Sequence, residues 1–262
     1  MDYDTLRFEV TDGVAEITLN RGEVYNALNL AMVRELYDAV RCCDDNPAVR
    51  AVVLTGAGKA FCAGGDLKSF EAQRDDIQAH VKDVTMWYHG AIARVARMRA
   101  PVLAAVNGVA AGGGMGLAMA CDLALAAESA RFTVAFTQAG LTPDSSASYY
   151  LPRLVGLRRA LDLTLTNRML SAAEAEAWGL VTYVVPDAEL MSRARELARR
   201  LALGASDALG GAKRLLREGW NETLETQMAR ESERIAQAAA GAEGREGITA
   251  FIEKRAPRFH QQ

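Results

Sequence analysis

The most constraining feature of this chain is an apolar run, residues 102–106, that passes directly into a glycine-rich turn at 107–116 and then into a helix of small residues ending near Cys121. An apolar run of this length between turn residues indicates a buried strand. Similar runs at 50–55 and 122–127 alternate with helical patterns. Continuously apolar strands that alternate with helices predict an α/β fold with buried parallel strands.

The segments around these strands predict further elements. Residues 5–20 predict a two-stranded hairpin with its turn at Asp12 and Gly13. One-sided apolar patterns predict helices at 29–43 and 72–98. The second helix is expected to stop before the next proline, because proline disfavours helix in the residue that precedes it.

The last third of the chain changes character. Ser171 and Glu174 have the spacing of a helix capping box, and strand-like residues 180–185 follow them. Beyond that strand every pattern is helical. The sequence therefore predicts an α/β core over residues 1–198 and a helical C-terminal region over residues 199–262.

Charge and cysteine use exclude several classes of partner. Lys and Arg number 30 against 33 Asp and Glu, and the basic residues are dispersed, so neither nucleic acid nor an anionic membrane is expected as a partner. No apolar run reaches the ~18 residues of a membrane span, and the acidic N-terminus is unlike a signal peptide. The four cysteines lack metal-site spacing, which predicts reduced thiols, no bound metal and a cytoplasmic location.

Five motifs are spread along almost the whole chain. They are LNR…NAL (19–28), FCAGGDL (61–67), AAVNGVAAGGG (104–114), LPRLVG (151–156) and TAFIEKR (249–255). In this order they resemble the crotonase superfamily, also called the enoyl-CoA hydratase/isomerase family. The resemblance implies a crotonase-like spiral of ββα units and a C-terminal α-helical region for trimerisation. It also implies a homotrimer or dimer of trimers and an acyl-CoA thioester substrate; coenzyme A is then part of the substrate, and no separate cofactor is expected.

Backbone amides are the first candidate catalytic groups. The resemblance implies that the N–H groups of Gly65 and Gly113 bind the thioester oxygen as it becomes an enolate anion, and one such donor is worth ~3–4 kcal/mol. The local sequence suits this role, because Gly113 lies where a strand turn enters a helix and free N–H groups can face an anion. The alternative is that glycines 112–116 permit tight helix packing and that Gly64 and Gly65 form only a turn.

The carboxylates point away from ordinary hydratase chemistry. Enoyl-CoA hydratases of this family use two glutamates, and the matching positions here are Gly116 and Phe136. Neither can move a proton, whereas hydration of a C=C bond needs a base for the water and an acid for the carbon. One carboxylate remains, Asp144, in a context that resembles the ring-epoxide isomerases of the phenylacetate pathway and related enoyl-CoA isomerases. A double-bond or ring isomerisation needs only one such proton shuttle.

Asp144 has two further interpretations. In its Pro-Asp-Ser-Ser context, ahead of an apolar helical run, it is also a good helix N-cap. Residues 147–150 and 163–168, together with His89, resemble 4-chlorobenzoyl-CoA dehalogenase, in which an aspartate attacks the ring and a histidine activates water. Phe136 replaces a tryptophan of that enzyme and so removes an indole N–H donor. For His89 the structural alternative is a partly buried helical histidine.

Residues that bind the coenzyme A part follow from the same resemblance. The expected adenine, pantetheine and acyl contacts fall on Val24, Ala63, Gly65, Asp66, Leu67 and Phe136. A C-terminal lysine, here Lys254, reaches the phosphates of a neighbouring subunit in this family; its alternative is a solvated helix end. Candidates for the acyl pocket, or else for the core, are Phe70, Met86, Trp87 and Tyr88.

Four functions therefore remain open for this sequence. The first is isomerisation of an acyl-CoA with Asp144 as proton shuttle. The second is nucleophilic, hydrolytic chemistry with Asp144 and His89. The third is an unorthodox hydratase or lyase reaction, and the fourth is acyl-CoA binding without catalysis.

Overall fold

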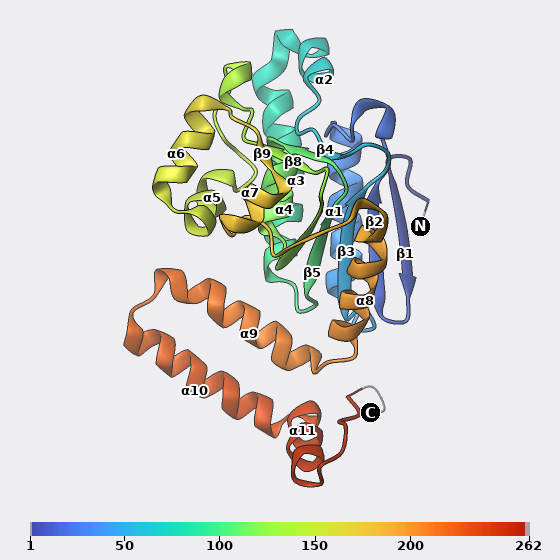
Figure 1. Cartoon of the computed structure of the whole chain (residues 1–262), viewed down its shortest axis with the longest axis vertical. Helices are drawn as coiled ribbons and strands as arrows, with labels where there is room; N and C mark the ends of the chain where they lie inside the picture. The colour runs from blue at the N-terminus through green and yellow to red at the C-terminus, as the bar shows by residue number, and fades with distance from the viewer. Residues whose placement is uncertain (1, 260–262) are drawn as a thin grey trace.

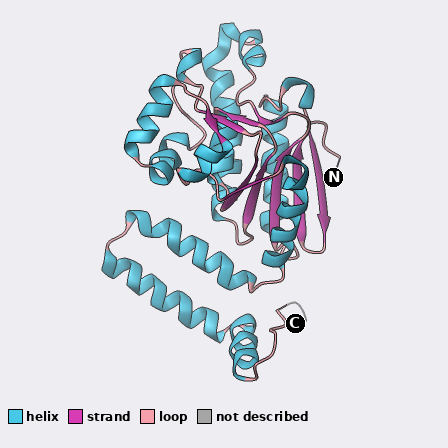
Figure 2. Cartoon of the chain, in the orientation of Figure 1, coloured by secondary structure: helices cyan, strands magenta, loops and turns pink. Residues whose placement is uncertain are grey.

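Between residues 51 and 133, consecutive strands of this chain alternate between two sheets. The computed structural model describes residues 2–259. The large sheet is formed by β1 (Leu6–Thr11), β2 (Val14–Leu19), β3 (Ala51–Gly56), β5 (Val102–Val106), β7 (Leu123–Ala127) and β10 (Tyr183–Val185), in that order across the sheet. The small sheet is formed by β4 (Ala60–Cys62), β6 (Val109–Ala111), β8 (Arg131–Thr133) and β9 (Leu170–Ser171), again in that order. Figure 2 shows both sheets enclosed by helices.

The large sheet is mostly parallel. β1 and β2 form the antiparallel hairpin expected around Asp12 and Gly13, whereas β2, β3, β5, β7 and β10 pair in parallel. Every residue of β3 and β5 is buried, as continuously apolar runs require when both faces of a sheet are covered. The α/β fold with buried parallel strands is confirmed.

The strands enter the two sheets in a repeated pattern. Three pairs of consecutive strands are each followed by helical structure: β3 with β4, β5 with β6, and β7 with β8. In each of these repeats the first strand joins the large sheet and the second joins the small sheet. This arrangement is the spiral of ββα units that the family resemblance implies. It places the second strands of three repeats side by side.

Helices surround this spiral. Those that precede the C-terminal region are α1 (Leu30–Asp45), α2 (Leu67–Ala72), α3 (Ile77–Arg97), α4 (Gly113–Ala120), α5 (Ala147–Val155), α6 (Leu157–Thr166), α7 (Ala172–Ala177) and α8 (Leu190–Ala202). The expected long helix begins at Ile77 rather than at 72, because α2 and a 3-10 turn, Arg74–Asp76, take up the residues before it. α8 packs on β3, β5 and β7, and α1 packs on α3.

Three further helices form the C-terminal part: α9 (Ser206–Glu218), α10 (Leu224–Ala240) and α11 (Ala242–Ile252). α9 is fixed to the core because Lys213 and Arg217 both pair with Asp122. α10 and α11 extend away from the sheets, so that α11 lies at the opposite end of the molecule from α2 (Figure 1). α8 runs through residue 198 to Ala202 and packs on β3, β5 and β7, so the position of the predicted boundary, 198/199, lies inside this helix. No helix of the described chain is both long and apolar enough to cross a membrane.

Candidate active site

Three loops meet at one edge of the small sheet. β4, β6 and β8 are neighbouring parallel strands. Gly65 lies just after β4, Gly113 just after β6 and Phe136 just after β8. Because parallel strands end at the same edge of a sheet, these residues are brought together although they are far apart in the sequence. Such an edge is where α/β proteins commonly bind ligands.

The loops after β4 and β6 touch backbone to backbone at Gly64. This residue has φ +90°, a conformation that favours glycine. A Cβ atom at Gly64 would lie 3.2 Å from the nitrogen of Gly113 and 2.9 Å from the carbonyl oxygen of Ala111. A side chain would therefore separate the two loops. Its absence holds the amides of Gly65 and Gly113 close to each other.

Both of these amides are free to bind a ligand. Leu28 bonds to the residues on either side of Gly65, since its N–H donates to Gly64 (2.8 Å) and its carbonyl accepts from Asp66 (3.0 Å). This parallel bridge turns the N–H of Gly65 away from Leu28. Gly113 is the first residue of α4, where an N–H has no partner within the helix. Within residues 2–259 neither N–H donates a hydrogen bond.

An unpaired N–H at Gly113 is notable because the residue is buried. Buried backbone donors without a partner are rare, and a helix N-terminus adds positive potential at the same point. Gly65, in contrast, is exposed. The two N–H groups, one on an exposed residue and one on a buried residue, form a site that can stabilise an oxyanion. The structure thus brings together the two amides predicted from the sequence.

Tyr88 fixes the peptide group on the other side of Gly113. Its hydroxyl donates to the carbonyl oxygen of Gly113 at 2.8 Å, and the side chain is buried. Burial is the main cause that raises the pKa of Tyr88 well above its usual value, and the charge of Asp144 acts in the same direction. The phenol therefore stays protonated and serves as a donor. We interpret Tyr88 as a support of the oxyanion site, a role that the sequence analysis did not assign.

Asp144 and His89 also meet, and Ser145 lies between them. The hydroxyl of Ser145 donates to Oδ1 of Asp144 at 2.7 Å. Oδ2 of Asp144 lies 3.5 Å from Nε2 of His89, and the backbone N–H of Ser145 donates to the same Nε2 at 3.2 Å. The hydroxyl of Ser145 would also lie 3.1 Å from a Cβ atom at Gly113. Ser145 therefore connects the carboxylate, the histidine and the oxyanion site.

The interpretation of Asp144 as a helix cap is wrong. The N-cap of α5 is Ser146, and no side chain caps this helix. Ser145 and Ser146 both have positive φ, 53° and 62°. Two successive non-glycine residues in the left-handed region store strain, which commonly marks a functional loop. The carboxylate of Asp144 bonds to the Ser145 hydroxyl and lies beside His89, and it does not cap α5.

Ser145 also occupies the space of a missing hydratase glutamate. A Cβ atom at Gly116 would collide with the carbonyl oxygen of Ser145. Any side chain at Gly116 would therefore displace the turn that holds Asp144. Phe136 lies close by, with its ring 3.7 Å from the Cβ position of Gly112. It adds an apolar wall and no titratable group.

The residues expected to contact coenzyme A line one side of the oxyanion site. The N–H of Ala63 donates to the carbonyl of Tyr25 at 3.0 Å, which places the loop containing Val24 beside Ala63. Leu67 is 55% exposed at the start of α2. The carboxylate of Asp66 is already engaged, since it caps α2 and pairs with Arg21 at 3.0 Å. Asp66 therefore shapes this loop through protein contacts.

Asn26 is a structural residue of this site that the sequence analysis missed. Its side chain is completely buried, and its Nδ2 donates to the carbonyls of Ala60 (2.8 Å) and Phe61 (3.1 Å). Its Oδ1 accepts from the N–H of Arg21. The position of Asn26 in the motif NAL was the available signal. The side chain holds the loop of residues 21–26 against β4.

The other candidates are divided by the structure. Phe70 and Tyr88 reach the glycine loops, since each ring lies within 3.3 Å of a Cβ position there, at Gly65 and Gly113 respectively. Trp87 instead packs edge-on against Tyr37 of α1, with ring centroids 5.3 Å apart, and belongs to the core. Met86 is exposed.

The structure of one chain does not bring the C-terminal basic residues to this site. Lys254 follows α11, at the far end of the molecule from α2 (Figure 1). The guanidinium of Arg255 is engaged by Glu246 and Glu253. A role for Lys254 at the phosphates of a neighbouring subunit stays a prediction. His260 lies outside the described residues.

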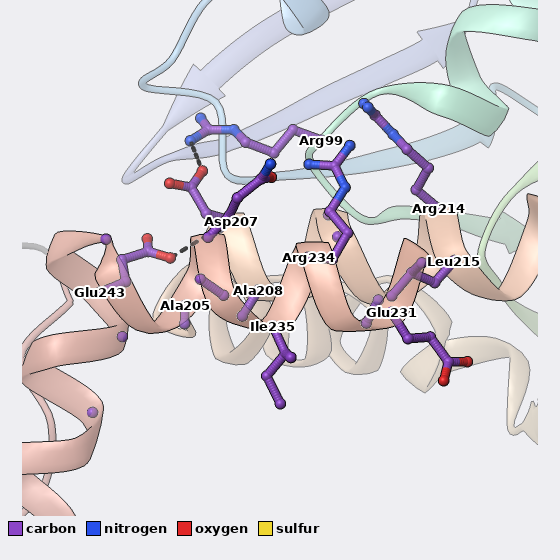
Figure 3. A pocket seen from close by; sticks show the side chains of 18 of the residues that line it. Arg99, Ala205, Asp207, Ala208, Arg214, Leu215, Glu231, Arg234, Ile235 and Glu243 are labelled. Atoms are coloured by element: carbon purple, nitrogen blue, oxygen red, sulfur yellow. Dashed lines mark hydrogen bonds and ion pairs between the residues drawn. The ribbon is translucent and has the colours of Figure 1, made fainter. Parts of the chain in front are cut away.

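Two cavities lie beyond the catalytic loops. The larger, about 1040 Å³, is formed by α9, α10 and α11 together with Arg99, and it contains none of the predicted site residues (Figure 3). The second, about 720 Å³, begins at His89 and Ser146. The first cavity is larger, but the second lies next to His89 and Asp144, which are candidate catalytic residues.

Comparison with known proteins places these features in context. The sequence pattern of the family described as enoyl-CoA hydratase/isomerase matches residues 9–262. The 1,2-epoxyphenylacetyl-CoA isomerase of Escherichia coli (strain K12) is 39% identical over 254 residues, which cover 95% of this chain and 96% of the relative. The 4-chlorobenzoyl coenzyme A dehalogenase-2 of Arthrobacter sp is 42% identical over 219 residues, 83% of this chain and 79% of the relative. The crystal structure of enoyl-CoA hydratase from Bacillus anthracis has a TM-score of 0.93 at 35% identity and covers 99% of this chain and 100% of that one.

Proposed function

The chain belongs to the enoyl-CoA hydratase/isomerase family, and we propose that within this family it isomerises acyl-CoA thioesters, with Asp144 as the group that moves the proton. The observation that carries this proposal is the link from Asp144 through the Ser145 hydroxyl to the Gly113 loop. No second carboxylate stands at the hydratase positions, which are Gly116 and Phe136. One shuttle beside an oxyanion site is sufficient for a 1,3-proton shift.

In the proposed reaction the thioester oxygen accepts hydrogen bonds from the N–H groups of Gly65 and Gly113. The carboxylate of Asp144 removes a proton from the carbon next to the thioester of a 3-enoyl chain. The electron pair moves into the conjugated system and the negative charge reaches the thioester oxygen. Asp144 then returns the proton to the far carbon of the former double bond. Each amide stabilises this charge by about 3 kcal/mol.

The two carboxylate oxygens of Asp144 have different contacts, which suggest different roles in the proposed reaction. Oδ1 accepts the hydroxyl of Ser145, while Oδ2 receives no hydrogen bond within residues 2–259. Oδ2 is therefore the oxygen that carries the proton. The side chain of Asp144 is about one-third exposed (34%). A bound acyl chain would cover this opening and separate the proton from bulk water.

A direct test uses 3-hexenoyl-CoA and follows the ultraviolet absorption of the conjugated 2-enoyl thioester. Wild type should form the conjugated product, and Asp144→Asn should lose at least about a hundredfold in kcat. Asp162→Asn, an exposed carboxylate on α6, is the matched control. Absence of isomerisation by wild type, or full activity of Asp144→Asn, would overturn the proposal. Tight binding of acyl-CoA without any turnover would favour the non-catalytic alternative.

A second candidate function is supported by one observation, the 3.5 Å contact between Asp144 and His89. In this alternative Asp144 attacks an aryl-CoA ring and displaces a halide, and His89 activates the water that hydrolyses the aryl ester. Chloride release from 4-chlorobenzoyl-CoA measures the whole cycle. Loss of that release in both Asp144→Asn and His89→Gln would support it. An unaffected His89→Gln variant would exclude the role of the histidine.

We also propose that the chain forms a homotrimer or a dimer of trimers through its C-terminal helices. Large apolar side chains there are exposed in the single chain: Ile235, Ile248, Phe251 and Ile252 are each more than half exposed. Leaving them in water is unfavourable by about 25 cal/mol per Å². Light scattering should give three or six copies for wild type and fewer for Phe251→Asp. In such an assembly Lys254 would reach coenzyme A phosphates of a neighbour, so Lys254→Met should weaken coenzyme A binding.

A further inference from the structure

A cavity of about 720 Å³ lies between α3, α5 and the end of α9. His89 and Ser146 line it beside the catalytic groups, and Arg97 and Arg214 also lie on its wall. We propose that this cavity binds the far end of the acyl group and that this end carries an anion, a carboxylate, held by Arg97 and Arg214. The inference rests on the proposed function in one respect, namely that the acyl chain passes Asp144.

The cavity adjoins the reacting groups through His89 and Ser146. His89 lies 3.5 Å from the carboxylate of Asp144, and Ser146 follows directly on Ser145, which bonds to both of them. In this proposal an acyl chain that extends past Asp144 enters the cavity beside these two residues.

The two arginines are available for a ligand. Within the described chain neither Arg97 nor Arg214 makes a hydrogen bond or an ion pair, although most arginines of this protein do. Arg217, on the same cavity wall, is already engaged by Asp122 at 3.0 Å. Arg214 lies between the two cavities and lines both of them; Figure 3 shows its side chain from the side of the larger one. The cavity thus contains two positive charges that no protein group neutralises.

One carboxylate on the wall could offset this charge, but it has its own partner. Glu218 lies 3.6 Å from Arg230 of α10. The remaining polar groups are Tyr149, Tyr150 and Asn221, which are uncharged, and Asn221 is within 3.4 Å of the hydroxyl of Tyr149. The excess of positive charge therefore favours an anionic ligand.

The rest of the wall suits a carbon chain. Ile92, Ala93 and Ala96 of α3 lie on it together with the two tyrosines. Pockets of this kind bind the apolar body of a ligand and use a few polar groups to fix its orientation. A guanidinium matches a carboxylate because its planar fork can donate two parallel hydrogen bonds. The site therefore selects an apolar chain with a carboxylate at its end.

The position of Arg97 limits the length of that chain. His89 and Arg97 are separated by eight residues of α3, or about 12 Å along the helix axis. This spacing favours longer chains, because a short dicarboxylate that starts at Asp144 does not span it.

The test compares equilibrium binding of saturated thioesters, which need no turnover. Adipoyl-CoA and suberyl-CoA are titrated calorimetrically against hexanoyl-CoA and octanoyl-CoA, for wild type, for Arg97→Met with Arg214→Met, and for Arg200→Met as a control on the surface of α8. Wild type and the control should bind suberyl-CoA at least about tenfold more tightly than octanoyl-CoA, and the shorter adipoyl pair should show a smaller preference in the same direction. In the double variant the ratio within each pair should fall to near one.

Equal affinities within each pair for wild type, no measurable binding of any of these esters, or a preference that survives in the double variant would each overturn the inference. The outcome is separable from the isomerase proposal. Isomerisation of 3-hexenoyl-CoA without any preference for carboxylate-ended esters would sink only the inference. A clear preference without isomerisation would sink only the isomerase proposal.

Discussion

The backbone N–H of Ser145 donates a hydrogen bond to Nε2 of His89 at 3.2 Å. In this contact Nε2 is the acceptor, so its lone pair is directed at the Ser145 amide. The same Nε2 lies 3.5 Å from Oδ2 of Asp144. To act as a base toward water, His89 must first release Ser145. Isomerisation through Asp144 requires no such step, and this difference favours it.

Removal of the Ser145 hydroxyl tests the positioning of Asp144. In Ser145→Ala the backbone bond to His89 remains, but Oδ1 of Asp144 loses its donor. We expect kcat for 3-hexenoyl-CoA to fall about tenfold, which corresponds to the ~1.4 kcal/mol of one charge-assisted hydrogen bond. KM should change little, because the residue does not contact the coenzyme A part. Ser148→Ala, on an exposed position of the next helix, is the control. A rise in KM at constant kcat would contradict this role.

Tyr88→Phe tests the support of the oxyanion site. The substitution leaves the carbonyl of buried Gly113 without the donor that it has at 2.8 Å. We expect a loss of about 1–3 kcal/mol in the free energy of unfolding, measured in urea, together with a fall in isomerase kcat. Tyr183→Phe, on an exposed strand position, should change neither quantity. Unchanged stability of Tyr88→Phe would show that this hydrogen bond does not hold the loop.

The close approach of Ser145 to Gly116 predicts that a hydratase glutamate cannot be restored by one substitution. Gly116→Ala already places a methyl group against the carbonyl oxygen of Ser145, which should destabilise the fold by about 1–3 kcal/mol. Gly211→Ala, in helix α9 with no atom near the new methyl group, should be neutral or slightly stabilising. Thermal unfolding compares the two.

The same contact bears on chemistry. Gly116→Glu should fail to hydrate 2-hexenoyl-CoA and should lose isomerase activity, because the turn that holds Asp144 is displaced. Product analysis by chromatography checks both reactions. Appearance of 3-hydroxyacyl-CoA with this variant would contradict the prediction, because it would show that the turn at residues 144–146 can accommodate a glutamate at position 116 in an active enzyme.

Glu174 should make stability depend on pH in acid. Its carboxylate accepts hydrogen bonds from the N–H and hydroxyl of Ser171 and from Arg168, and these contacts, the backbone one first, lower the pKa of Glu174 from 4.5 to about 2. A lowered pKa in the folded state stabilises above pH 4.5, and this contribution is lost as the pH falls toward 2. Wild type should therefore unfold at higher urea than Glu174→Gln at pH 7, and the difference should shrink across that window. Glu231→Gln, which removes a carboxylate without such contacts, should show no comparable change.

Much of the fold was accessible from local patterns. The runs at 50–55 and 102–106, the hairpin at Asp12 and Gly13 and the capping box at Ser171 are all confirmed, because each depends on residues close together in the sequence. All four strands of the small sheet, β4, β6, β8 and β9, were missed. They contain two or three residues each, which is too short for a periodic pattern to develop.

The site was predicted in part, for a similar reason. The motifs identified Gly65, Gly113, Asp144 and His89, and the structure brings both pairs together. The role of Ser145 depends on two positive φ angles and on contacts with α3 and α4. The support that Tyr88 gives depends on a carbonyl 25 residues away in the sequence. Relations of this kind are set by tertiary packing, and no local pattern encodes them.

The two amides of the anion site come from successive turns of the spiral, and their spacing is set by the pairing of β4 with β6. The donors themselves are backbone groups, and the side chains of Tyr88 and Asn26 only support the loops that carry them. Acidic and basic side chains around the two amides can therefore be substituted, added or removed without changing the oxyanion site that binds the thioester. The same oxyanion site can therefore serve several reactions in proteins of this fold. Which reaction a given chain catalyses must be inferred from the side chains around the two amides, because the amides are common to all of these reactions.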